Sequence, residues 1–288
     1  MLVADKWKDY RVIATGDGYK LEDWKGVKLL RPDPQVIWPP HIDMAAYKGL
    51  NARYSRSATG GGKWEVLKKY PDEWVISYGE LKFLIKPMGF KHTGLFPEQA
   101  VNWDKMSELI RGAGREISVL NLFAYTGGAT VACLKAGAKV CHVDAAKGMV
   151  ERAGENCRLT GVGEGKVRFI IDDCLKFVKR EIKRGKKYDA VIMDPPSFGR
   201  GPNGETWKIE NELFGLVKTC VEVLSDNPLF FLINSYTTGL QPQVIKNILT
   251  LNLKSLGGTF DAYEVGLPTD EGIVLPCGCS GLWQNDKG

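Results

Sequence analysis

The chain has no apolar run long enough to span a bilayer, only three histidines, and no internal repeat or low-complexity segment. The missing apolar run argues against a membrane-spanning protein. Because histidine is scarce and Cys277 and Cys279 are the one close cysteine pair, we expect no metal site. The other cysteines are scattered singly through apolar segments, which indicates reduced, mostly buried thiols rather than a disulfide framework. Charged residues from Asp5 onwards interrupt the N-terminus before a signal-peptide core forms, so we expect a cytoplasmic protein.

Charge and composition bound the class of protein. The 39 basic and 34 acidic residues give a net charge of +5 and a pI near 8.7, which permits a polyanionic partner without requiring one. With 44% hydrophobic and 25% charged residues, the 288-residue chain has the composition of a globular enzyme. The pattern changes near residue 95, so we predict a β-rich domain over residues 1–94, which could contact substrate or RNA, and a catalytic domain over residues 95–288. The sequence leaves open whether the protein is a monomer or a homodimer.

The first ninety or so residues alternate short β-prone runs with glycine and proline signals. This pattern predicts a small antiparallel β domain. The expected strands fall within Lys8–Ala14, Gly26–Leu30, Val36–Trp38, Glu73–Ile76 and Leu81–Pro87.

After residue 95, apolar strands alternate with helices, which predicts a Rossmann-like, doubly wound, mostly parallel sheet in an α/β fold. Ligands bind such sheets at the carboxyl ends of the strands. The expected strands are Ile117–Phe123, Lys139–Asp144, Val167–Ile171, Tyr188–Asp194, Leu229–Asn234 and Thr259–Val265. The expected helices are Gln99–Gly112, Ala129–Ala136, Lys147–Thr160, Cys174–Arg184, Lys208–Leu224 and Gln241–Leu253.

The loop after the first of these strands contains Gly127 and Gly128 directly before a helix. Adjacent glycines allow the backbone to approach a ligand, and a helix N-terminus favours an anion. The loop does not match Gly-x-Gly-x-x-Gly, which weakens a dinucleotide interpretation, because the missing first glycine is the one that makes room for a pyrophosphate. The carboxylate of a methionine-derived cofactor needs less room than a pyrophosphate. A tight turn without a ligand explains this motif alone equally well. Asp144 and Asp173, which follow the next two strands, suit ribose hydroxyls and an adenine amine, although either alone is more often a helix cap.

Asp194-Pro195-Pro196-Ser197-Phe198 follows another apolar strand and is the most specific motif of the chain. The prolines fix the backbone and leave carbonyls that no helix satisfies. These carbonyls and the Asp194 carboxylate can accept hydrogen bonds from a planar amine or base edge, and Phe198 can stack on the ring. The alternative is a rigid loop with a buried phenylalanine.

With these motifs, residues from about Phe96 to Trp283 resemble the class I S-adenosylmethionine-dependent methyltransferases. The nearest resemblance is to the bacterial family that includes the 23S rRNA cytosine-C5 and guanine-N7 methyltransferases. It implies a seven-stranded methyltransferase sheet, S-adenosyl-L-methionine as cofactor and ribosomal RNA as substrate and partner. It also implies that Phe123, Tyr125 and Gly127 surround the methionine part, Asp144 the ribose and Asp173 the adenine. The full expected cofactor set is Gln99, Asn121, Phe123, Tyr125, Thr126, Gly127, Asp144, Asn156, Asp173 and Asp194.

Two departures from that family shape the expected chemistry. Its cytosine-C5 enzymes carry a cysteine just after the fifth strand, whereas here the loop reads Asn234-Ser235-Tyr236-Thr237-Thr238. Its N-terminal RNA-binding module of the PUA type is also not evident. We therefore favour methylation of a nitrogen, with Asp194 and the Pro195 carbonyl orienting the acceptor amine and Phe198 and Tyr236 sandwiching its ring. A methyltransferase of the same fold for a small molecule or protein, and a non-catalytic RNA-binding protein, stay open.

Overall fold

The computed structural model describes residues 1–57, 61–200 and 206–286. The chain forms two compact units: Met1–Val101 with Val265–Cys277, and Asn102–Glu264 with Gly278–Gly288. The long strands β16 (Thr259–Pro268) and β17 (Val274–Gln284) contribute residues to both units. The boundary near residue 95 stays a prediction. Within the described ranges, no helix combines the length and hydrophobicity that crossing a membrane requires.

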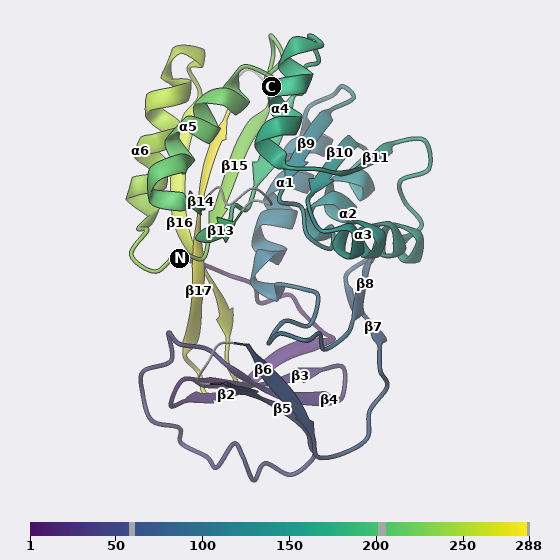
Figure 1. Ribbon diagram of the computed structural model, residues 1–288, viewed down its shortest axis with the longest axis vertical. Helices are drawn as coiled ribbons and strands as arrows, with labels where there is room; N and C mark the ends of the chain where they lie inside the picture. The colour runs from purple at the N-terminus through teal and green to yellow at the C-terminus, as the bar shows by residue number, and fades with distance from the viewer. Residues whose placement is uncertain (58–60, 201–205, 287–288) are drawn as a thin grey trace. The chain divides into compact units, whose positions relative to one another are not determined.

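The largest sheet within the described residues has the order β1-β16-β17-β15-β12-β9-β10-β11, and its strands β9 to β12 and β15 belong to the second unit (Figure 1). β9 to β12 and β15 pair in parallel, and β17 runs antiparallel to β15, so the predicted doubly wound, mostly parallel sheet is confirmed. An eighth strand, β1 (Leu2–Val3), extends the edge by pairing with Val265 and Gly266 of the first unit. The remaining strands of this sheet are β9 (Ser118–Leu122), β10 (Lys139–Asp144), β11 (Val167–Ile171), β12 (Ala190–Met193) and β15 (Phe230–Ser235).

Helices cover both faces of this sheet because its central strands are apolar on both sides. On one face, β9, β10, β12 and β15 share a buried core with α4, α5 and α6. On the other face α2 and α3 pack together and contact β10. The helices are α1 (Ala100–Gly112), α2 (Gly128–Lys135), α3 (Lys147–Thr160), α4 (Cys174–Lys183), α5 (Ile209–Val221) and α6 (Pro242–Leu253), with 3-10 turns η1 (Pro97–Gln99) and η2 (Lys254–Leu256).

A short hairpin of β13 (Phe198–Arg200) and β14 (Thr206–Lys208) lies between β12 and α5 along the chain. The sequence pattern did not predict it, because strands of three residues are too short to show an alternation of apolar and polar side chains.

The first unit contains a five-stranded sheet in the order β2-β3-β4-β5-β6 and a separate hairpin of β7 and β8. Pairing is antiparallel except between β4 and β5, which run parallel because residues 33–49 supply a long connection. The strands are β2 (Tyr10–Gly16), β3 (Tyr19–Trp24), β4 (Val27–Pro32), β5 (Leu50–Arg56), β6 (Gly62–Val66), β7 (Trp74–Tyr78) and β8 (Leu81–Ile85).

The strand predicted over Val36–Trp38 was wrong, since these residues lie in the connection between β4 and β5. Pro34 and Pro39 flank them and cannot donate to a sheet. Val36 is nevertheless buried, and the Trp38 indole N–H donates to the Thr15 hydroxyl at 3.0 Å. Their apolar character therefore serves packing rather than strand pairing.

Candidate active site

The loop between β9 and α2 has an unusual backbone. Phe123 and Tyr125 have φ angles of 52° and 50°, and Gly127 has a φ of 81°, so three of five consecutive residues are left-handed. This conformation costs a residue with a side chain about 1–2 kcal/mol. Strain of this kind persists where surrounding contacts fix it, and it concentrates at ligand sites.

Asp144, at the end of β10, holds this loop. One carboxylate oxygen accepts a 2.8 Å hydrogen bond from the Tyr125 backbone N–H, and the other accepts one of 2.8 Å from the Ala146 N–H. The side chain is only half-buried. Each oxygen can accept a further bond, so Asp144 keeps acceptor capacity for the ribose hydroxyls that the resemblance assigned to it.

Two buried asparagines support the same loop from behind. The Asn156 amide donates to the Thr126 carbonyl at 2.9 Å, and the Asn121 amide donates to the Thr130 hydroxyl at 2.9 Å. That hydroxyl lies 2.9 Å from Nδ1 of His142. Asn121 and Asn156 thus fix the loop and the first turn of α2.

The start of α2 suits an anionic group. Gly127 precedes the helix and makes no side-chain cap, so the first backbone N–H groups remain available at the positive end of the helix dipole. A Cβ atom on Gly127 would lie 2.8 Å from Cβ of Ala153, and one on Gly128 would lie 2.8 Å from the Trp103 ring. Gly127 is required by close packing and by its positive φ, whereas Gly128 is required by close packing alone.

Asp173 is exposed at the N-terminus of α4, where one carboxylate oxygen accepts from the Lys176 N–H at 2.8 Å. Its other oxygen accepts no hydrogen bond within the described residues, so capping and ligand binding are compatible. The next residue, Cys174, is buried, and its sulfur accepts from the Phe123 N–H at 3.2 Å. Cys174 is a contact to the strained loop that sequence reasoning missed.

The Asp194 motif begins where β12 ends, next to the strained loop. β12 pairs with β9 so that Met193 lies opposite Leu122, and the Asp194 N–H donates to the Leu122 carbonyl at 3.4 Å. Asp194 and Phe123 therefore each follow the last paired residue of two adjacent parallel strands. Pro195 is buried beside them.

The rest of this motif is joined to neighbouring segments. The Pro196 carbonyl accepts a 2.6 Å hydrogen bond from the indole N–H of Trp207 on β14. The Ser197 and Thr237 hydroxyls are 2.6 Å apart, which connects the loops after β12 and β15. Trp207 also lies with its ring centroid 6.1 Å from that of Phe123. No local pattern marked Trp207, because it reaches the site through the short β13–β14 hairpin.

Phe198 and Tyr236 come from the same two loops. Phe198 is 52% exposed, so the alternative of a rigid loop with a buried phenylalanine was wrong. Tyr236 is half-buried and directly follows β15. Gln99, the remaining expected cofactor residue, is buried at the end of η1 in the first unit.

A buried polar network fixes the end of β15. Oδ1 of Asn234 accepts from the Ser280 hydroxyl at 2.8 Å and from Nδ2 of Asn102 at 3.1 Å. Oδ1 of Asn102 accepts in turn from the Tyr263 hydroxyl at 2.8 Å. Met193 lies opposite Ile233, so Asn234 is the register neighbour of Asp194.

The cysteines are poorly suited to nucleophilic chemistry. All seven are free thiols, and burial raises the pKa of each of them. Cys279, opposite Ser235 at the end of β15, has a pKa raised to about 11 and donates to the Leu240 carbonyl at 3.3 Å. A thiolate nucleophile needs a lowered pKa instead.

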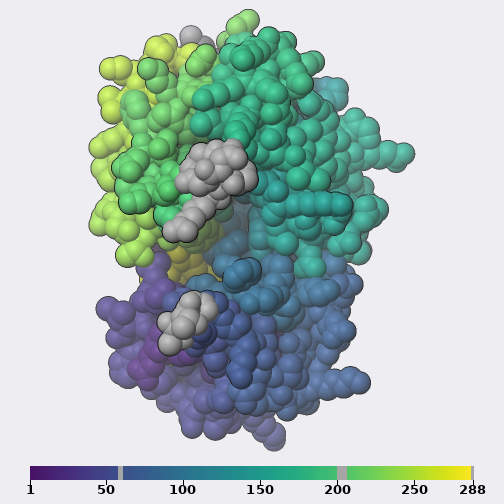
Figure 2. Space-filling model, in the orientation of Figure 1, coloured from purple at the N-terminus to yellow at the C-terminus, as the bar shows by residue number. Residues whose placement is uncertain are grey.

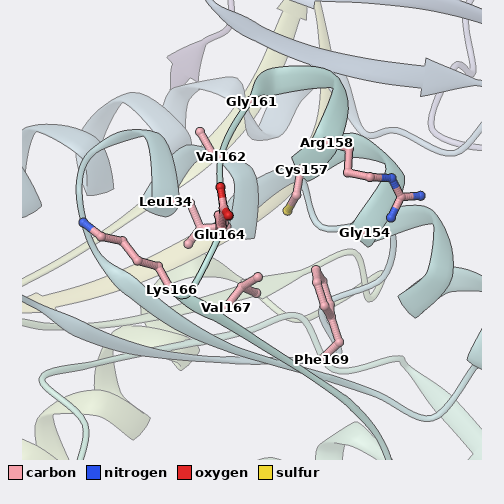
Figure 3. Close-up of a pocket in the computed structure, with 11 residues that line it drawn as sticks. Leu134, Gly154, Cys157, Arg158, Gly161, Val162, Glu164, Lys166, Val167 and Phe169 are labelled. Carbon is pink, nitrogen blue, oxygen red and sulfur yellow. The ribbon is translucent and has the colours of Figure 1, made fainter.

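A separate pocket of about 700 Å³ has none of the expected cofactor or catalytic residues in its lining (Figure 3). It is formed by the end of α3, the segment that follows it and the first residues of β11, and it includes Cys157, Arg158 and Lys166. Because Val167 begins β11, this pocket is near the amino end of that strand rather than at the carboxyl ends. It does not coincide with the predicted cofactor site.

A doubly wound sheet of this order, with a strained loop after β9 and an acid after β10, defines a Rossmann-like protein with a nucleotide-type cofactor site. Residues 45–225 match the S-adenosylmethionine-dependent methyltransferase family, and the chain belongs to that family. The resemblance inferred from the motifs, including S-adenosylmethionine as cofactor, is thereby confirmed.

Individual relatives agree with this assignment. The chain is 30% identical to a SAM-dependent methyltransferase from Agrobacterium tumefaciens, with a TM-score of 0.91 over 99% of this chain and 93% of that one. It is 30% identical over 69% of its length to a putative ribosomal RNA large subunit methyltransferase of Methanocaldococcus jannaschii. It is 31% identical over 68% of its length to ribosomal RNA large subunit methyltransferase I of Aeromonas hydrophila. The chain spans about half the length of these last two proteins, 49% and 48% respectively.

Proposed function

We propose that this protein transfers the methyl group of S-adenosylmethionine to a base of ribosomal RNA, at a nitrogen rather than through a covalent cytosine intermediate. The observation that carries the proposal is that Asp194 directly follows β12 and donates its N–H to the Leu122 carbonyl at the end of β9, so its carboxylate starts beside the strained loop that we assign to the cofactor. The names of the M. jannaschii and A. hydrophila relatives support RNA as the substrate class.

The residues present fit the cofactor. The uncapped start of α2 suits the methionine carboxylate, Asp144 has spare acceptor capacity for the ribose hydroxyls, and the second oxygen of Asp173 suits the adenine amine. When bound, S-adenosylmethionine supplies a methyl group on a positively charged sulfonium. The chain supports transfer by binding and orientation.

On the substrate side, the Asp194 carboxylate would accept a hydrogen bond from the amine and so direct its lone pair. Phe198 and Tyr236 would hold the ring between them, which an exposed Phe198 permits. Orientation of this kind can supply about 7–11 kcal/mol of a barrier without a strong base. The raised pKa of Cys279 supports nitrogen chemistry, because attack on C6 of cytosine needs a thiolate.

The test is methylation of deproteinised ribosomal RNA from a strain lacking the gene, using methyl-labelled S-adenosylmethionine, followed by digestion and mass spectrometry. We expect label in a single N-methylated nucleoside. Asp194→Asn should lower turnover by about 10²-fold while cofactor affinity is unchanged, and Asp226→Asn, an exposed aspartate of the same unit, should change neither.

The other outcomes separate the alternatives. Label in 5-methylcytidine would overturn the nitrogen assignment while leaving RNA as substrate. Label in protein or small molecules, with none in RNA, would favour a methyltransferase of the same fold that acts on a small molecule or protein. Intact cofactor binding with no transfer to any of these fractions would favour a non-catalytic RNA-binding protein.

A further inference from the structure

One segment of the first unit carries a net positive charge. Residues 48–91 contain nine lysines and arginines and four acidic residues, a net charge of +5 that equals that of the whole chain. The segment comprises β5 to β8 and the loop after β8, all within the first unit. Residues 1–57 and 61–101 are coloured from purple to blue in Figure 2. A local excess of cations on a nearly neutral chain favours contact with a polyanion.

The loop after β8 presents an aromatic ring at its tip. The Met88 N–H donates to the His92 carbonyl at 3.1 Å, which closes a tight turn around Phe90. Phe90 is 67% exposed, although a ring of this size is ordinarily buried. The faces of this ring are therefore accessible to a planar ligand.

The backbone of this tip is held from two sides. The Trp64 indole N–H on β6 donates to the Phe90 carbonyl at 3.2 Å, and Nη1 of Arg31 donates to the Lys91 carbonyl at 2.9 Å. Arg31 is itself fixed by two hydrogen bonds to the buried Glu22, at 2.6 and 2.7 Å. Because the loop is already ordered, a ligand that stacks on Phe90 has little ordering cost to offset.

Two cations accompany the ring. Alternation along β5 puts Arg56 on the same face as Tyr54, whose ring packs edge-on against Trp64 at 5.4 Å. Burial, reinforced by nearby positive charges that include Arg56, lowers the pKa of Lys91. Neither Arg56 nor Lys91 forms an ion pair within the part of the chain that the structure describes. The Lys91 ammonium donates to the Pro32 carbonyl at 3.4 Å and keeps two further N–H donors, so both cations can bind an anion.

We propose that Phe90, Trp64, Arg56 and Lys91, called here the Phe90 face, bind a single-stranded segment of RNA. Phe90 stacks on an unpaired base, and Arg56 and Lys91 neutralise adjacent phosphates. A protruding ring reaches the flat face of a base only where that base is unstacked, which excludes a regular duplex. The inference rests on the proposed function for its RNA and adds the site on the first unit that holds it.

The test uses the full chain and a fluorescein-labelled oligouridine of about 12 nucleotides, measured by fluorescence anisotropy at low and physiological salt. Phe90→Ala should weaken binding about tenfold. Arg56→Gln with Lys91→Gln should reduce the salt dependence of log K by about 0.7 for each phosphate that is no longer neutralised. An RNA duplex of the same length should bind more weakly than the single strand.

Matched controls exist in the same unit. Lys63→Gln removes one positive charge from β6 on the face opposite Trp64 and is compared with Arg56→Gln alone, and Ile37→Ala removes an apolar side chain that is 89% exposed. Both should bind oligouridine like the unsubstituted chain. Three results would each overturn the proposal. Phe90→Ala could leave the affinity for oligouridine unchanged, Lys63→Gln could weaken binding as much as Arg56→Gln alone, or the duplex could bind as tightly as the single strand. Thermal unfolding checks that every variant folds.

The binding assay and the methylation assay test the two proposals separately, so that either proposal can be rejected without the other. Loss of oligouridine binding by Phe90→Ala, with no labelled nucleoside from ribosomal RNA, would sustain the Phe90 face and reject the proposed reaction. Labelled ribosomal RNA with no effect of Phe90→Ala on binding would do the reverse.

Discussion

The carboxylate of Asp144 accepts a 2.8 Å hydrogen bond from the backbone N–H of Tyr125, a residue whose φ of 50° is left-handed. The acid at the end of β10 therefore holds the strained loop after β9. The same side chain carries the oxygen atoms that we propose as acceptors for the ribose hydroxyls. This arrangement reduces the cost of ordering the loop on binding.

Asp144→Asn tests this relationship. The variant keeps the shape of the side chain but replaces one acceptor with an NH₂ group that faces a backbone N–H. We expect a loss of about 1–3 kcal/mol in the free energy of unfolding and about 10- to 100-fold in affinity for S-adenosylhomocysteine, measured by denaturant titration and calorimetry. Asp261→Asn is the control, since this exposed aspartate also accepts from a backbone N–H. Equal effects of the two substitutions would contradict the special role of Asp144.

Gly127→Ala tests the packing of the loop against α3. It combines a φ of 81° with a Cβ atom only 2.8 Å from Cβ of Ala153. Gly137→Ala has a φ of 106° but meets nothing within 4 Å, so it measures backbone strain alone. We expect Gly127→Ala to cost about 1–3 kcal/mol more than Gly137→Ala in chemical unfolding. Adding Ala153→Gly should recover part of that difference, and no recovery would argue against the contact.

The sheet could be predicted from the sequence because its buried parallel strands are continuous apolar runs. Lys139–Asp144 and Val167–Ile171 have the predicted limits. β17 (Val274–Gln284) was not predicted, because Pro276, Gly278 and Gly281 interrupt its apolar pattern. Gly278 and Gly281 are small for a reason that only the fold reveals: a Cβ on Gly281 would lie 2.4 Å from Ile245 of α6.

From the sequence, only those residues of the candidate site that lie at the end of a strand could be predicted. Asp144 ends β10 and Asp194 directly follows β12, the two strands that flank β9 in the sheet. The sequence identifies a residue at such a position but not its hydrogen-bond partners. Asn121 and Asn156 therefore carried an expected cofactor role, whereas the contacts described above join them to Thr130 and to the Thr126 carbonyl. Their direct contact with the cofactor stays a prediction.

The buried His142 predicts a pH dependence of stability. Burial lowers its pKa to about 4, below the value of 6.5 for an exposed imidazole. The unfolded state therefore binds the proton first as pH falls, so the contribution is complete above pH 6.5 and is lost as pH falls toward 4. We expect His142 to account for a loss of about 2 kcal/mol by about pH 5.

Denaturant titration across this range checks the expectation. His142→Asn, which retains an acceptor for the Thr130 hydroxyl, should flatten the dependence on pH. His92, whose pKa burial also lowers to about 4, contributes in the same direction, so His92→Asn measures the share of the first unit. An unchanged slope in His142→Asn would rule out His142 as the source.

Removal of the cysteines near the end of the chain tests the nitrogen chemistry. Cys279 is buried with a pKa raised to about 11, and burial raises the pKa of Cys277 as well. Neither thiol is prepared for attack on a pyrimidine, so Cys277→Ala and Cys279→Ala should each methylate ribosomal RNA at about the normal rate. With a covalent mechanism, one variant would instead lose about 10³-fold or more in methylation rate.

Thermal unfolding of both variants is the control, because Cys279→Ala also removes the hydrogen bond to the Leu240 carbonyl. A variant that is folded, binds S-adenosylhomocysteine normally and yet transfers no methyl group would identify its cysteine as the nucleophile and reject direct transfer to nitrogen.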